Sequence, residues 1–236
     1  MNGSFSCDSG CLLVNTHDGM RSVFCRTSFP FLGLGYEGWD FLLRLDELEE
    51  RMIQEINGRM PLRSVLFIGM CKDSICALML ATRLRRSYPA LPIGVWGCAW
   101  AADCTGKTPS CKGMSLSPVH EAIRLKEPYK TLLRVADPLR LLDDPATQPL
   151  HLFAFYCRHP YWTMDEEATQ RLKHRLTETY VHDADERQSM AEVHTKILKL
   201  ARFQPQLVSS WILDMFRRME GDLCAGNITR LDEMPD

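Results

Sequence analysis

The sequence predicts an α/β protein with a mostly parallel sheet flanked by helices, and with further helices at its C-terminal end. Three short apolar runs support this prediction, because each has the length and composition of a strand buried on both faces: Val65–Ile68, Ile93–Cys98 and Leu150–Cys157. Helical patterns separate these runs along the chain. Strands that alternate with helices pair in parallel, so we expect the three runs to be adjacent in one sheet.

Weaker elements precede the first of these strands. A short strand over Leu12–Asn15 ends at a turn, and an irregular loop rich in glycine and aromatic residues covers Phe29–Asp40. Another short strand is expected between them, over Val23–Cys25. A helix over Phe41–Ile56 follows, because its apolar residues recur on one face, and Asn57-Gly58 ends it.

Helices dominate the part after the second buried strand. A capping box that begins at Thr163 opens one of them. The predicted elements are, in order, a loop over Trp100–Met114, a broken helix over Pro118–Arg134, a helical turn over Pro138–Leu142, the strand Leu150–Cys157, a helix over 163–175, a strand over Glu178–Val181, and helices over 185–203 and Leu207–Met219.

Composition is typical of one globular domain. The chain has 236 residues, of which 45% are hydrophobic and 25% charged. We expect a flexible leader over residues 1–10, a single α/β domain over 11–220 and a polar tail over 221–236.

Charge and cysteine usage narrow the class of protein. A net charge of −2 offers no electrostatic basis for nucleic-acid binding. No apolar run approaches the roughly 20 residues that span a membrane, and we find no secretory signal. The ten cysteines are scattered, which suits free thiols in a reducing compartment. We therefore predict a cytoplasmic protein.

The most informative stretch is the turn after Val65–Ile68. Gly69 breaks the strand, and apolar residues recur at helical spacing from Ile75. α/β proteins place a nucleophile or a phosphate at such a turn. The pattern G-x-S-x-G of a nucleophile elbow fits Gly69–Asp73 if Cys71 replaces the serine and Asp73 replaces the second glycine.

This turn, with the strand and helix order over residues 60–203, resembles the α/β-hydrolase superfamily, in which dienelactone hydrolases use a cysteine nucleophile. Ala77 and Ala81 fall where the helix of that elbow packs small residues. The resemblance implies a three-layer α/β-hydrolase-like architecture and an ester or thioester hydrolase, or an acyltransferase, with Cys71 as its nucleophile. Asp73 departs from the family pattern, since it crowds the turn and its carboxylate opposes formation of a thiolate.

The resemblance also implies a catalytic triad. In the family the acid follows the next-to-last strand, and here Asp165 is the nearest carboxylate; alternatively, Asp165 only favours the dipole of its own helix. The histidine follows the last strand, where His182 would take the proton of Cys71 while Asp165 orients the imidazole. His182 is otherwise an exposed histidine at a strand end, and His194 is a rival base.

The remaining members of the site are less specific. The resemblance implies two backbone N–H donors for an oxyanion, one from Lys72 and one from Thr16 in the turn after the first strand. Asp183 or Asp185 is an alternative acid. Two aromatic residues, Tyr161 and Trp162, follow the strand that ends at Cys157. They either line an acyl pocket or serve ordinary packing.

Other readings of the turn stay open. Lys72-Asp73-Ser74 matches the last positions of the S-G-G-x-D-S loop of N-type ATP pyrophosphatases, which suggests an adenylating or nucleotide-binding enzyme, although the phosphate-binding glycines are missing. A catalytically inactive scaffold or interaction protein of the same fold would dock partners through the helix Leu207–Met219. In the simplest reading the turn has no chemistry and Cys71 is a small buried hydrophobe.

Metal and cofactor signals are weak. Cys98, Cys104, Cys111 and His120 lack the closely spaced pairs of structural zinc sites. We predict no metal and no cofactor, and expect a small-molecule or carrier-bound acyl substrate.

Overall fold

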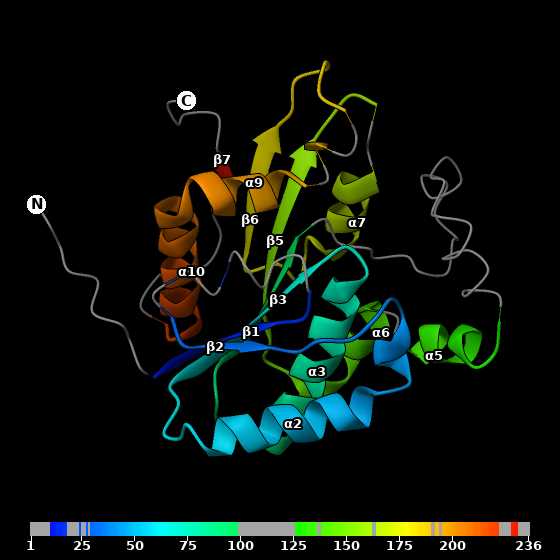
Figure 1. The fold of residues 1–236 in the computed structure, drawn as a ribbon, viewed down its shortest axis with the longest axis vertical. Coiled ribbons are helices and arrows are strands. Elements are labelled where there is room, and N and C mark those ends of the chain that lie inside the picture. Colours follow the sequence, from blue (N-terminus) through cyan, green and yellow to red (C-terminus); the bar gives the residue numbers. More distant parts are fainter. Residues whose placement is uncertain are drawn as a thin grey trace, which may run out of the picture.

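The computed structural model describes residues 10–17, 24, 27, 29–98, 126–135, 138–161, 164–189, 192–193, 195–221 and 228–230. Over these residues seven strands form one parallel sheet in the spatial order β2-β1-β3-β4-β5-β6-β7 (Figure 1). The strands are β1 (Cys11–Asn15), β2 (Phe31–Gly33), β3 (Ser64–Met70), β4 (Ile93–Cys98), β5 (His151–Arg158), β6 (Glu178–Asp183) and β7 (Ile228–Arg230). The segments predicted near 23–25 and 100–114 lie largely outside the described residues.

The three apolar runs form the centre of the sheet, as predicted. β3, β4 and β5 are neighbours, with Ile68 in register with Trp96 and Trp96 in register with Phe153. Successive side chains of β3 enter different core clusters, Val65 on one face of the sheet and Leu66 on the other. Burial on both faces is the reason that these strands read as continuous apolar runs.

The sheet extends further than the sequence indicated. β2 lies in the stretch predicted as an irregular loop, and β7 lies in the predicted polar tail. Both strands have three residues and form the edges of the sheet. So short a strand carries no readable period-2 pattern, and its pairing with β1 or β6 determines its conformation.

Helices cover both faces of the sheet, which confirms the predicted three-layer architecture. One layer contains α2 (Leu45–Asn57), α3 (Asp73–Ser87), α6 (Pro138–Asp143) and α7 (Met164–Leu172), and the other contains α9 (Lys196–Phe203) and α10 (Pro205–Met219) (Figure 1). Shorter elements are the 3₁₀ helices η1 (Asp40–Leu42) and η3 (Pro145–Thr147), and α5 (Tyr129–Val135).

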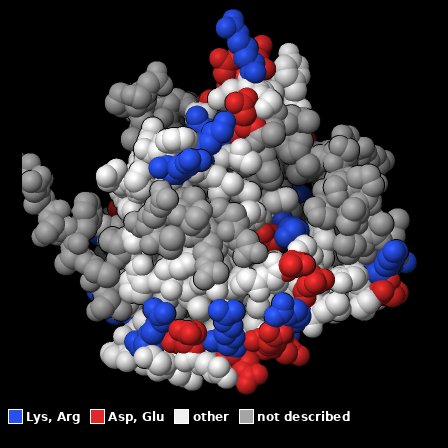
Figure 2. All heavy atoms as spheres, viewed as in Figure 1, with Lys and Arg blue, Asp and Glu red and all other residues white. Residues whose placement is uncertain are grey.

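Charged side chains of both signs lie over the outer helices. Figure 2 shows Lys and Arg alternating with Asp and Glu along the lower edge of the molecule, where Figure 1 places α2. Arg83 of α3 pairs with Asp46 and Glu49 of α2 at 2.5 and 2.6 Å. Asp46 is exposed, so its pair with Arg83 contributes little to stability, and the two signs of charge alternate along this edge.

The apolar face of α10 is buried against the sheet. The ring of Trp211 lies 5.2 Å from that of Tyr180 and 6.3 Å from that of Trp96. Arg218 pairs with the buried carboxylate of Glu178 at 2.6 Å. The side chains that suggested a docking surface on this helix therefore cover the sheet instead, and that surface is occupied within the chain. No helix in the described ranges is long and apolar enough to cross a membrane.

Two boundaries near the C-terminal helices differ from the prediction. β6 continues to Asp183, residues 184–189 are not helical, and helical backbone returns at residues 192–193 and in α9 from Lys196. The Asp185 carboxylate accepts a hydrogen bond from the Arg187 N–H at 2.8 Å. Local side-chain bonds of this kind compete with the hydrogen bonds of a helix, so the chain forms a turn here.

Candidate functional site

The turn between β3 and α3 holds Cys71 in a left-handed backbone conformation. Its φ is 53°, and among the described residues it is the only non-glycine residue with a positive φ. The Cys71 N–H donates to the Cys98 carbonyl at 2.9 Å, and the Ser74 N–H donates to the Cys71 carbonyl at 3.1 Å. A residue held in this conformation costs about 1–2 kcal/mol. The backbone strain of this turn therefore lies at Cys71, the residue that the sequence motif predicts as the nucleophile.

Gly69 allows strand and helix to approach closely at this turn. A Cβ at this position would lie 2.4 Å from the Asp73 carbonyl oxygen and 2.6 Å from the Ser74 Cα. Backbone atoms cannot rotate away as a side chain can, so only glycine fits here. Gly69 and the strained Cys71 together give the turn the geometry of a nucleophile elbow.

Asp73 is not strained, contrary to the crowding that its place in the motif suggested. It is the first residue of α3, and its buried carboxylate has three polar neighbours. The Tyr36 hydroxyl donates to Oδ1 at 2.8 Å, and the Lys72 ammonium lies 2.6 Å from the same oxygen. Nε2 of His17 lies 3.7 Å from Oδ2. We call these four residues, Asp73, Tyr36, Lys72 and His17, the Asp73 cluster.

Burial dominates the electrostatics of the Asp73 cluster. It raises the pKa of the Asp73 carboxyl, while Lys72, His17 and the Tyr36 hydroxyl oppose that rise. Burial also raises the pKa of Tyr36, with Cys76 and Asp73 adding to the effect. Lys72 lies 5.6 Å above the Tyr36 ring. The carboxylate that was expected to repel a Cys71 thiolate is thus accompanied by a cation and an imidazole.

The two proposed oxyanion donors differ in their surroundings. Lys72 is the N-cap residue of α3, so its N–H has no acceptor in the helix itself. The Thr16 N–H donates to the Ile68 carbonyl at 3.0 Å. The Thr16 hydroxyl also lies 3.0 Å from that carbonyl and 2.9 Å from the carbonyl of Asp73. Thr16 therefore ties the end of β1 to the elbow, and its amide is already engaged.

Among the described residues, the structure does not bring His182 to Cys71. His182 lies inside β6, in register with Cys157, because that strand is longer than predicted. β6 is three positions from β3, about 14 Å at the usual strand spacing, which exceeds the reach of the two side chains. Asp165 lies in the first turn of α7, but its side chain, like the whole of His194, lies outside the described residues.

A histidine at the end of β5 went unnoticed in the sequence. His159 is buried, and its Nδ1 accepts a hydrogen bond from the Tyr161 N–H at 3.1 Å. The ring of Tyr161, which is 75% exposed, lies edge-on to this imidazole at 5.7 Å. Trp162 lies outside the described residues. Nothing in the pattern around residue 159 distinguishes a buried histidine from a loop histidine.

Most of the weak candidates for metal ligands lie outside the described residues. Of Cys98, Cys104, Cys111 and His120, only Cys98 belongs to the described residues, and it is buried at the end of β4. Burial, with the neighbouring Cys157, raises the pKa of its thiol. Within the described ranges, no three His, Cys, Asp or Glu side chains are grouped as metal ligands.

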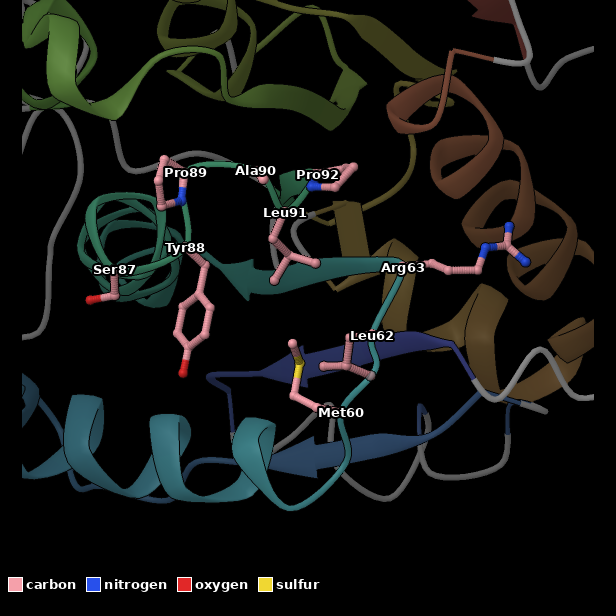
Figure 3. A pocket seen from close by; sticks show the side chains of 9 residues that line it. All are labelled: Met60, Leu62, Arg63, Ser87, Tyr88, Pro89, Ala90, Leu91 and Pro92. Atoms are coloured by element: carbon pink, nitrogen blue, oxygen red, sulfur yellow. The ribbon is translucent and has the colours of Figure 1, made fainter.

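The cavity drawn in Figure 3 lies at the opposite end of the sheet. It has a volume of about 400 Å³ and opens before the first residues of β3 and β4, whereas Cys71 follows the last residue of β3. Met60, Tyr88 and Leu91 are among the side chains that line it (Figure 3). Ligands of open α/β sheets bind outside the carboxyl ends of the strands, so this cavity is not part of the candidate site.

Comparison with known proteins identifies the fold. No protein-family model and no curated protein matches the sequence. The HSL homologue EstE7 from a metagenome library aligns with a TM-score of 0.60 at 11% identity, over 89% of this chain and 80% of that one. One of two fungal esterases from Rhizomucor miehei aligns with a TM-score of 0.59 at 10% identity, over 90% and 75%. Carboxyl esterase 2 from Tuber melanosporum gives 0.58 at 10% identity, over 89% and 78%. The parallel sheet and its helical layers agree with these likenesses, and the chain adopts the α/β-hydrolase fold.

Proposed function

We propose that this protein is an ester or thioester hydrolase, or an acyltransferase, that uses Cys71 as its nucleophile. The observation that carries the proposal is the positive φ of Cys71 at the turn between β3 and α3. An elbow of this kind lifts one side chain above the sheet at the amino end of a helix, where an anion is favoured. Strain at a chemically capable residue is typical of functional sites.

The proposed reaction passes through an acyl-enzyme. The Cys71 thiolate attacks the carbonyl carbon of the substrate, and the developing oxyanion accepts a hydrogen bond from the Lys72 N–H. The C–O or C–S bond then breaks, and the alcohol or thiol leaves after taking up a proton. Water releases the acid from Cys71 in a hydrolase, whereas another nucleophile takes the acyl group in an acyltransferase.

The base and the acid remain part of the proposal. His182 and His194 are the candidate bases in the region where the fold places its histidine, and Asp165 is the candidate acid. His182 can serve Cys71 only if the end of β6 leaves the sheet. A loss of turnover in His194→Gln but not in His182→Gln would assign the base to His194.

Turnover of p-nitrophenyl acetate and of an acyl thioester tests the nucleophile. Cys71→Ala should lose at least about 100-fold in kcat, because it has no nucleophile at the elbow, whereas Cys71→Ser keeps a hydroxyl there and should lose less. Intact-protein mass spectrometry should show one added acetyl group early in the reaction, and peptide mapping should place it on Cys71. The matched control is Cys76→Ala, which removes a buried thiol one turn into α3. Undiminished turnover in Cys71→Ala would exclude Cys71 as the nucleophile.

The inactive scaffold is the second candidate, and one observation favours it. In the described part of the chain, no histidine nitrogen is within hydrogen-bond distance of the Cys71 sulfur. The scaffold predicts no acyl-enzyme with any activated ester. The nucleotide reading has less support, because the buried carboxylate of Asp73 occupies the first turn of α3, where a phosphate would bind. Saturable ATP binding would revive it.

A further inference from the structure

We propose that His17 is a positioning residue for Cys71: held by the buried carboxylate of Asp73, it adds a positive charge beside the elbow when protonated and so favours the reactive thiolate. This inference rests on the proposed function. His17 lies near the N-terminal end of the chain, whereas His182 and His194 lie toward its C-terminal end. The role proposed for His17 requires neither of them.

Strand register places His17 beside the elbow. Asn15 is in register with Ile68, and the Thr16 N–H continues the pairing of β1 and β3 by donating to the Ile68 carbonyl at 3.0 Å. His17 is the next residue, so its backbone lies beside the last residues of β3. The Asn15 side-chain amide holds the His17 carbonyl at 2.7 Å, which restrains the histidine on its backbone side.

Asp73 holds the imidazole of His17. Its Oδ2 lies 3.7 Å from Nε2 of His17, while Oδ1 is engaged by Tyr36 and Lys72. The carbonyl of Asp73 lies 2.9 Å from the Thr16 hydroxyl. The residue that replaces the second glycine of the elbow thus contacts both Thr16 and His17. A glycine at position 73 has no carboxylate with which to hold the histidine.

The charges of the Asp73 cluster make His17 the variable member. Lys72 and Asp73 form an ion pair at 2.6 Å and largely cancel each other. The side chain of His17 is 22% exposed and can exchange protons with solvent. The other described titratable groups around Asp73 are Tyr36, from the segment after β2, and Cys76 of α3, and burial keeps both neutral. Protonation of His17 therefore changes the net charge beside Cys71 by one unit.

The rate of Cys71 alkylation by iodoacetamide tests this role without any substrate. The thiolate is the form that reacts, and the rate at Cys71 is read by peptide mapping. His17→Gln keeps a polar side chain that cannot charge. We expect it to slow alkylation about fivefold at pH 6, below the usual pKa of an imidazole, and to leave the rate at pH 8.5 unchanged. His174→Gln, an exposed site in the turn after α7, is the matched control and should change neither rate.

The outcomes separate this inference from its alternatives. If His17→Gln has the same ratio of alkylation rates at pH 6 and pH 8.5 as the wild type, the inference is wrong. If both rates are also lower by the same factor, His17 has a structural role alone. Circular dichroism establishes that the variant is folded, and His17→Asn replaces His17→Gln if the latter does not fold. Because alkylation needs no turnover, absent esterase activity with a shifted pH profile would refute the proposed function and leave the role of His17 intact.

Discussion

Replacing Cys71 by glycine and by alanine tests the strained turn on which the candidate site depends. Both variants remove the thiol, so their difference in stability reports the backbone alone. At φ 53° a non-glycine residue costs about 1–2 kcal/mol, which alanine retains and glycine removes. Glycine loses about 0.5–1 kcal/mol more than alanine through unfolded-state entropy. Cys71→Gly should therefore be more stable than Cys71→Ala, by about 0.75 kcal/mol at the centre of these two ranges.

Cys76 provides the matched control, because it is fully buried in the interior of α3. Glycine in the interior of a helix is less stable than alanine by about 1 kcal/mol, so the order of the two variants should reverse there. Urea unfolding followed by circular dichroism measures all four free energies of unfolding. In a chain of this length, 1 kcal/mol corresponds to about 2–4 °C in melting temperature. If Cys71→Ala equals or exceeds Cys71→Gly in stability, Cys71 does not adopt the left-handed conformation, and the turn is not a nucleophile elbow.

Two further predictions concern the same turn. Gly69→Ala should lower the free energy of unfolding in urea by at least about 3 kcal/mol, because its Cβ meets backbone atoms of Asp73. Gly94→Ala is the control and should cost about 1 kcal/mol, since its Cβ meets the flexible side chain of Met219. Equal costs would contradict the close approach at Gly69. Asp73→Asn keeps an acceptor for the Tyr36 hydroxyl and removes a carboxyl whose pKa burial raises above 3.8. A raised pKa stabilises the folded state below pH 3.8 and loses that contribution as pH rises through the folded value. Asp73→Asn should therefore gain stability relative to the wild type as pH rises above 3.8, and a constant difference would count against the raised pKa.

The sequence by itself determined the centre of the fold. Residues 65–68, 93–98 and 150–157 are apolar at every or nearly every position because both faces of their strands are buried. The turn at Gly69 was readable because a strand pattern changes to a helical one within a few residues. These signals are local, so they survive in the sequence without knowledge of contacts.

The candidate site was only partly readable. The place of Cys71 followed from the motif, but its backbone conformation is held by a hydrogen bond from its N–H to the carbonyl of Cys98, 27 residues away along the chain. His182 was expected in a loop after a strand ending at Val181. Pairing with β5 extends β6 by two residues and holds this histidine inside the sheet. Strand ends depend on the neighbouring strand, which the pattern of a single segment does not contain.

Only the tertiary structure decided what Asp73 does and what α10 covers. In the sequence, Asp73 is an off-pattern residue in a turn, yet its partners come from positions 17 and 36, on segments that the sheet brings together. The apolar stripe of α10 suits a partner and a core equally well, and in the folded chain it packs against Trp96 and Tyr180 on the face of the sheet that α9 also covers. An apolar pattern records that a face is buried, whereas the surface that buries it is chosen by the folded chain.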